Sequence, residues 1–89
     1  MTRYRLDYEP TARKQLRAVR DRRLKAPLEA ALADLTVDPR PPGCEKLSGF
    51  KHHWRIRVGD WRVVYRIEEG RLVVMVVTVG PRGGVYRGL

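Results

Sequence analysis

The chain has 89 residues, of which 43% are hydrophobic, and this fits a single domain (residues 1–89) with one modest core. Its formal net charge of +9 points to a nucleic acid, an anionic membrane or an acidic protein as partner. The sequence has no membrane-spanning apolar run, and its first residues lack the apolar stretch of a signal peptide, so we expect none. Cys44 is its only cysteine. We therefore expect a cytoplasmic protein with no disulfide and no membrane partner.

The N-terminal half predicts one strand followed by two helices. Residues 4–8 alternate apolar and charged side chains, which indicates a short strand. Pro10 suits the first turn of a helix. A second helix is expected with Asp21 as its N-cap. Pro27 falls inside the apolar stripe of that helix, so the helix either starts late or has a kinked first turn. The apolar positions are Ala12, Leu16 and Val19 in the first helix and Leu24, Leu28, Ala31, Leu32 and Leu35 in the second.

The C-terminal half predicts a run of strands. Residues 38–43, DPRPPG, form a connector, and residues 44–53 lead into a hairpin over residues 54–65. Gly59-Asp60 suits a type II′ turn, which would pair Val58 with Trp61. A second turn follows at residues 69–70, and the apolar residues 72–79 predict a central strand covered on both faces. The order β-α-α-β-β-β predicts an α+β domain with an antiparallel sheet and two helices packed on one of its faces.

Alternation gives the hairpin two distinct faces. The expected core face consists of Trp54, Ile56, Val58, Trp61, Val63 and Tyr65. The opposite face carries Arg55, Arg57, Arg62 and Arg66. Arg57 would lie directly opposite Arg62, and opposed like charges destabilise a sheet. Either this face binds an anion such as phosphate, or its arginines simply extend into water.

The chemistry-bearing residues favour phosphate over metal. His52 and His53 are adjacent and no cluster of cysteines or carboxylates completes a metal site, so no metal or cofactor is expected. Arginine forks match phosphate oxygens and can stabilise a pentavalent phosphorane. Arginine is a poor proton acceptor, so another residue must move protons. Tyr86 is a candidate for this role, although on spacing alone a surface aromatic is the commoner interpretation.

The whole chain resembles the RelE side of the RelE/ParE toxin superfamily. The match runs through three segments: EKLSG at 45–49, WRIRVGDWRVVYRI at 54–67 and VTVGPRGGVYR at 77–87. The resemblance implies a RelE-like toxin of a type II toxin–antitoxin module. Such toxins are metal-independent endoribonucleases that cut mRNA in the ribosomal A site. The RNA's 2′-hydroxyl attacks the adjacent phosphate and leaves a 2′,3′-cyclic phosphate. The implied partners are mRNA, the 70S ribosome and a cognate antitoxin with an amphipathic, acidic segment that forms a hetero-oligomer with the toxin.

The resemblance also assigns roles to individual residues. Arg62 matches the phosphate-stabilising arginine, and Arg82 matches an arginine that contacts the leaving group or the phosphate. Tyr86 matches the tyrosine that orients or helps to deprotonate the attacking hydroxyl. Arg55 and Arg57 replace two lysines, so they keep an electrostatic role while the general base stays open between Tyr86 and His53. The expected RNA-binding residues are Lys46, Lys51, His53 and Arg66.

Two other functions share part of this pattern. One is a ParE-like toxin that inhibits a topoisomerase and has no ribonuclease activity. The other is a basic RNA-binding module without chemistry. The combination of Arg62, Arg82 and Tyr86 favours RNA cleavage, because ParE-like relatives generally lack it.

Overall fold

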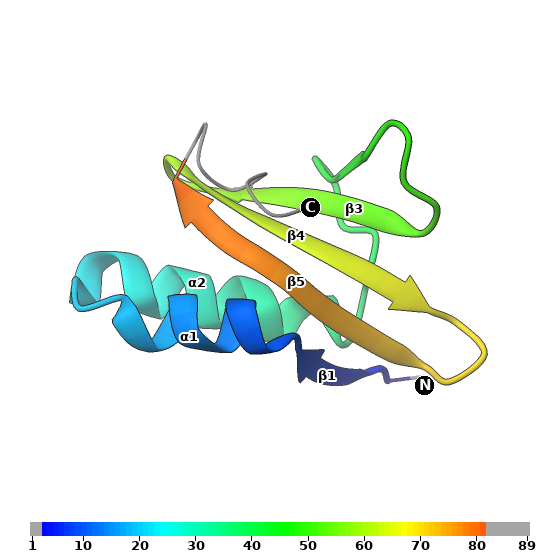
Figure 1. Cartoon of the computed structure of the whole chain (residues 1–89), viewed down its shortest axis with the longest axis horizontal. Coiled ribbons are helices and arrows are strands. Elements are labelled where there is room, and N and C mark those ends of the chain that lie inside the picture. Colours follow the sequence, from blue (N-terminus) through cyan, green and yellow to red (C-terminus); the bar gives the residue numbers. More distant parts are fainter. Residues whose placement is uncertain (1–2, 82–89) are drawn as a thin grey trace.

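The computed structural model describes residues 3–81, which form two helices and a five-stranded sheet (Figure 1). The elements are β1 (Arg5–Tyr8), α1 (Pro10–Ala18), α2 (Arg22–Leu35), β2 (Glu45–Lys46), β3 (His53–Val58), β4 (Trp61–Glu68) and β5 (Val73–Pro81). The strand order is β1-β5-β4-β3-β2, and both helices lie on one side of the sheet (Figure 1). The predicted α+β architecture is confirmed. Arg82 and Tyr86 lie outside the described residues.

Two features of the sheet differ from the prediction. The two-residue strand β2 pairs with β3, where only a connecting segment was expected. In addition, β1 pairs with β5 in parallel, so the sheet is mixed rather than wholly antiparallel. Two residues are too few to show an alternating pattern, which is why β2 leaves no signal in the sequence. No turn links β1 to β5, so no local turn chemistry reveals their relative direction.

Local sequence signals set the helix starts as predicted. Pro10 occupies the first turn of α1. The Asp21 carboxylate caps α2 by accepting a hydrogen bond of 2.9 Å from the Arg23 N–H. A late start for α2 is wrong, because the helix begins at Arg22 and contains Pro27. Pro27 has no N–H to donate to the Arg23 carbonyl, so this helix lacks one internal hydrogen bond.

The central hairpin has the predicted register. Val58 lies opposite Trp61, and Arg57 lies opposite Arg62. Gly59 has a φ of 60°, whereas Asp60 is not in the positive-φ region, and these signs fit a type II′ turn. A two-residue turn of this kind fixes the pairing of both strands, and therefore which side chains share a face.

The hydrophobic core lies between the helices and the sheet, on the predicted core face of the hairpin. Val63 and Tyr65 are fully buried, and the Tyr65 hydroxyl donates a 2.7 Å hydrogen bond to the Pro39 carbonyl. Burial raises the pKa of Tyr65 far above its ordinary range. The half-buried hairpin residues that pack against this core are Trp54, Val58 and Trp61. The helices add Ala12, Leu28, Leu32 and Leu35.

One polar side chain, that of Gln15, secures the edge of β5 beyond the end of β1. The pairing with β1 reaches only Val76. Further along, the Gln15 side chain of α1 accepts a 2.6 Å hydrogen bond from the Val79 N–H and donates one of 3.0 Å to Thr78 Oγ1. These contacts hold the end of β5 against α1, and that end of β5 pairs with the start of β4.

Within residues 3–81, no helix is long and apolar enough to cross a membrane.

Candidate active site

The sheet face turned away from the helices carries a row of basic side chains. On β3, His53, Arg55 and Arg57 point to this face at alternate positions. On β4, Arg66 and Arg62 lie opposite the two ends of that row. The prediction that the four hairpin arginines share one face is therefore confirmed. We call this surface the arginine face.

Arg62 is not open to solvent as expected, because only 8% of it is exposed. Its strand is an inner one, with Arg57 opposite on one side and Gly80 opposite on the other. Among the described residues Arg62 forms no ion pair, and its Nη1 donates one 3.2 Å hydrogen bond to the Trp61 carbonyl. A guanidinium has five N–H donors, and a buried charge without a counter-ion is costly. The position is therefore suited to an added anion.

Glu45 is a site residue that the sequence reasoning missed. Strand β2 places Glu45 opposite Arg55, and Arg55 Nη2 lies 2.7 Å from Glu45 Oε2. This hydrogen bond and the charge of Arg55 hold the pKa of the Glu45 carboxyl below its ordinary range, and Arg57 and Arg62 lower it further. Glu45 is thus an ionised carboxylate in the field of three arginines. Only the unpredicted β2–β3 pairing reveals it.

The remaining predicted RNA-binding residues occupy different surroundings. His53 ends the row on the arginine face, and its Nδ1 lies 2.8 Å from the Lys51 carbonyl. Lys51 is exposed in the loop before β3. Lys46 lies opposite Trp54, a core-face residue, so its strand position directs it away from the arginine face. The structure thus brings His53, but not Lys46, into line with the arginines.

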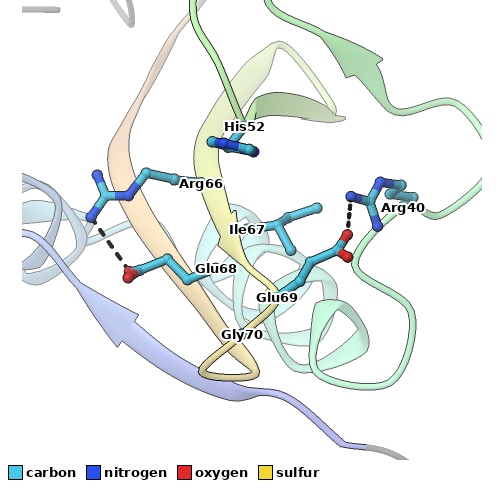
Figure 2. A pocket seen from close by; sticks show the side chains of 7 residues that line it. All are labelled: Arg40, His52, Arg66, Ile67, Glu68, Glu69 and Gly70. Atoms are coloured by element: carbon cyan, nitrogen blue, oxygen red, sulfur yellow. Dashed lines mark hydrogen bonds and ion pairs between the residues drawn. The ribbon is translucent and has the colours of Figure 1, made fainter.

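Arg66 belongs to a second charged region, at the opposite end of the hairpin from the turn. A hollow of about 590 Å³ lies here. Figure 2 shows the side chains that line it. Arg66 Nη2 lies 3.5 Å from Glu68 Oε2 and 3.4 Å from Glu9 Oε1. On the other side of the hollow, Arg40 is paired with Glu69 (Figure 2). The charges here form ion pairs with one another, whereas Arg62 forms no ion pair among the described residues.

No metal site was found in the part of the chain that the structure describes. No three histidine, cysteine or carboxylate side chains among residues 3–81 lie close enough together to hold a metal ion. The surroundings of Arg62 contain two kinds of functional group: arginines that can bind an anion and a carboxylate that can accept a proton. Arg57 and Arg62 can hold a phosphate, and Glu45 can accept a proton from a hydroxyl beside it.

The fold matches solved toxin structures. The isolated Escherichia coli RelE toxin is 28% identical with a TM-score of 0.78, over 88% of this chain and 83% of that one. RelE in the archaeal RelE–RelB complex from Pyrococcus horikoshii OT3 is 26% identical with a TM-score of 0.78, over 96% of this chain and 100% of that one. The fold and the basic face thus define a small toxin of the RelE type.

The sequence comparisons agree with the structural ones. Toxin RelG of Mycobacterium tuberculosis is 30% identical over 84 residues, which are 94% of this chain and 97% of RelG. The sequence model described as "ParE toxin of type II toxin-antitoxin system, parDE" matches residues 6–86. The chain belongs to the RelE/ParE superfamily and is a toxin of a type II toxin–antitoxin system.

Proposed function

We propose that this toxin is an endoribonuclease that cleaves mRNA without a metal ion, with the scissile phosphate bound at Arg57 and Arg62. The observation that carries the proposal is the buried Arg62, which forms no ion pair with any of the described residues. Arginine forks bind phosphate oxygens in a bidentate way, and a phosphate here would relieve the repulsion between the two opposed arginines. RNA is a polyanion that fits a chain of charge +9.

The proposed reaction uses the RNA's own 2′-hydroxyl as nucleophile. Its oxygen bonds to the adjacent phosphorus, and its proton passes to a general base. The bond from phosphorus to the 5′-oxygen breaks, and that oxygen takes up a proton to become a free 5′-hydroxyl. The other product ends in a 2′,3′-cyclic phosphate. Arg57 and Arg62 would stabilise the extra negative charge on the pentavalent phosphorus, which is commonly the largest catalytic contribution.

Glu45 is our candidate for the general base. A glutamate carboxylate is ionised at neutral pH, and Glu45 lies in the field of Arg57 and Arg62, so it is placed to accept the proton of a 2′-hydroxyl bound there. The lowered pKa makes Glu45 a weaker base, so the assignment rests on its position and not on the shift. Arg55 would act as a positioning residue, because its 2.7 Å contact orients the carboxylate. Arg82 and Tyr86 keep the roles that the family resemblance implies: a contact to the phosphate or leaving group, and orientation of the attacking hydroxyl.

The base assignment is tested with Glu45→Gln, which keeps the size of the side chain but cannot accept the proton. The matched control is Glu69→Gln in the β4–β5 turn, a carboxylate paired with Arg40 away from the arginine face. Glu45→Gln should lose at least about 100-fold in single-turnover cleavage, in the range of general-base catalysis, and bind RNA at least as tightly as wild type. Cleavage equal to that of the control would show that another residue is the base.

We propose the cellular setting of the reaction from the resemblance to the same family. We expect cleavage in the A site of the 70S ribosome. We also expect neutralisation by a cognate antitoxin in a hetero-oligomer, as RelE is found with RelB in the Pyrococcus complex. The antitoxin's toxin-binding segment should be amphipathic and acidic, because it must cover a strongly basic surface.

A ParE-like toxin that inhibits a topoisomerase is the second candidate, favoured by the ParE name of the matching family. Induced expression followed by primer extension on cellular mRNA separates the two. New 5′ ends within translated frames, absent for an Arg62→Ala variant expressed at the same level, support the ribonuclease. Intact mRNA with arrested DNA replication supports the ParE-like toxin. Effects on RNA that require stoichiometric protein would indicate a binding module without chemistry.

A further inference from the structure

A solvent-exposed aromatic side chain extends the arginine face beyond its last strand residue. Phe50 lies in the loop between β2 and β3 and is 39% exposed. Its ring packs on the His53 ring, with centroids 5.4 Å apart and planes at 49°. The base of the loop is held by a 3.0 Å hydrogen bond from the Leu47 N–H to the His53 carbonyl. Phe50 is thus presented to solvent on a supported loop.

The backbone of this loop adopts costly conformations to hold that shape. Gly49 has a φ of 82°, which glycine tolerates readily. His52 has a φ of 65°, a region that side chains with a Cβ rarely adopt. Phe50 lies between these two residues. Strain of this kind persists only where the surroundings enforce it, and it is common at binding sites.

The surroundings of Phe50 are basic and concave. Phe50 lines a hollow of about 400 Å³ together with Lys46 and Lys51. Its partner His53 is in the same strand row as Arg55 and Arg57, and at about 3.3 Å per residue it lies roughly 13 Å from Arg57 along β3. A bound strand of RNA with one phosphate at Arg57 can span this distance with its neighbouring nucleotides. An exposed aromatic flanked by lysines, continuous with a phosphate site, is the arrangement that binds single-stranded nucleic acid.

We propose that Phe50, backed by His53, is a stacking platform for the base of a nucleotide that flanks the scissile phosphate. The inference rests on the proposed function and adds a base-binding subsite to it. Lys51, next to Phe50 in the loop, would attract the phosphate of that nucleotide. Stacking on an aromatic ring tolerates any base, so this subsite would supply affinity and alignment rather than strict sequence preference. An RNA base is favoured over a protein side chain because the hollow is bordered by two lysines.

The test compares Phe50→Ala, Phe50→Trp and a control, Leu72→Ala. Leu72 is an apolar residue of similar exposure, 41%, in the β4–β5 turn. The RNA carries 2-aminopurine as the flanking base and a 2′-deoxy sugar at the attacked position, so that it binds but is not cut. It is offered both free and in the A site of programmed 70S ribosomes. Stacking quenches the 2-aminopurine fluorescence, which a purely structural role of Phe50 would not produce.

Wild type, Phe50→Trp and Leu72→Ala should quench the fluorescence, and Phe50→Ala should not. On cleavable RNA, Phe50→Ala should raise KM on the order of 10-fold, while the maximal rate changes less. Quenching and KM equal to wild type in Phe50→Ala would overturn the inference and leave the ribonuclease proposal standing. Loss of antitoxin binding with normal cleavage would instead assign Phe50 to the antitoxin interface. A wild-type protein that neither binds nor cuts RNA would overturn both proposals.

Discussion

Arg62→Ala is the substitution for which the structure makes the sharpest prediction. Arg62 is 8% exposed, lies beside Arg57 and has no ion pair among the described residues. Truncation removes a buried charge that forms no ion pair with a described residue, so the fold should lose little. We expect a melting temperature within about 5 °C of wild type, which corresponds to roughly 1 kcal/mol for a domain of this size. The same variant should lose its toxicity.

The expected loss of activity follows from the role of the guanidinium. Removing one preformed donor from a developing charge typically costs about 100- to 1000-fold in rate. The assay is single-turnover cleavage of mRNA on programmed ribosomes, beside growth after induced expression. The control is Arg71→Ala, an exposed arginine paired with Glu68 near the β4–β5 turn. It removes the same charge from the protein and should cleave at the wild-type rate.

Two results would refute this reasoning about Arg62. If Arg62→Ala cleaves like Arg71→Ala, the buried guanidinium does not hold the scissile phosphate. If Arg62→Ala unfolds, its burial is structural and the uncompensated charge has a partner in the folded protein. An Arg62→Ala variant that is folded and inactive meets both expectations. Few residues with a purely structural role give that combination.

Three further predictions follow from other contacts. Tyr65→Phe should lower the free energy of unfolding by about 1–3 kcal/mol, because the buried Pro39 carbonyl loses its donor; an unchanged melting curve would contradict this. The lowered pKa of Glu45 keeps this base ionised down to about pH 5, so the cleavage rate should not fall between about pH 8 and pH 5. Cleavage should be lost only as the pH drops through the pKa of Glu45. If a histidine were the base, activity would instead be lost between about pH 7 and pH 6. Co-expression of the adjacent small reading frame should restore growth and yield a copurified complex; a toxin that no neighbouring gene product binds would contradict the antitoxin proposal.

The parts of the fold that local chemistry determines were predictable from the sequence. Gly59-Asp60 selects a two-residue turn, and that turn alone fixes the pairing of Arg57 with Arg62. The Asp21 cap and the position of Pro10 were likewise visible, because each acts within one helical turn. The hairpin turn and the alternation of side chains along its two strands place the arginines on one face without any long-range contact.

The parts that depend on long-range packing were not predictable. Strand β2 has only two residues, so nothing in the sequence showed that Glu45 would lie against Arg55. The parallel pairing of β1 with β5 joins segments that are distant in sequence and share no turn. Alternation assigns Arg62 to a face but does not show that the residue is almost fully buried there. The roles of Arg82 and Tyr86 stay predictions from the family resemblance.

The chemical nature of the RNA ends tests the central claim most directly. Wild-type protein should produce fragments with a 2′,3′-cyclic phosphate and a 5′-hydroxyl, identified by mass spectrometry of a short mRNA cut on programmed ribosomes. A 2′-deoxy sugar at the attacked nucleotide should abolish cleavage there, because the nucleophile is missing. Fragments with a 3′-hydroxyl and a 5′-phosphate, or cleavage that persists at the 2′-deoxy position, would show that water attacks the phosphate and would contradict the mechanism.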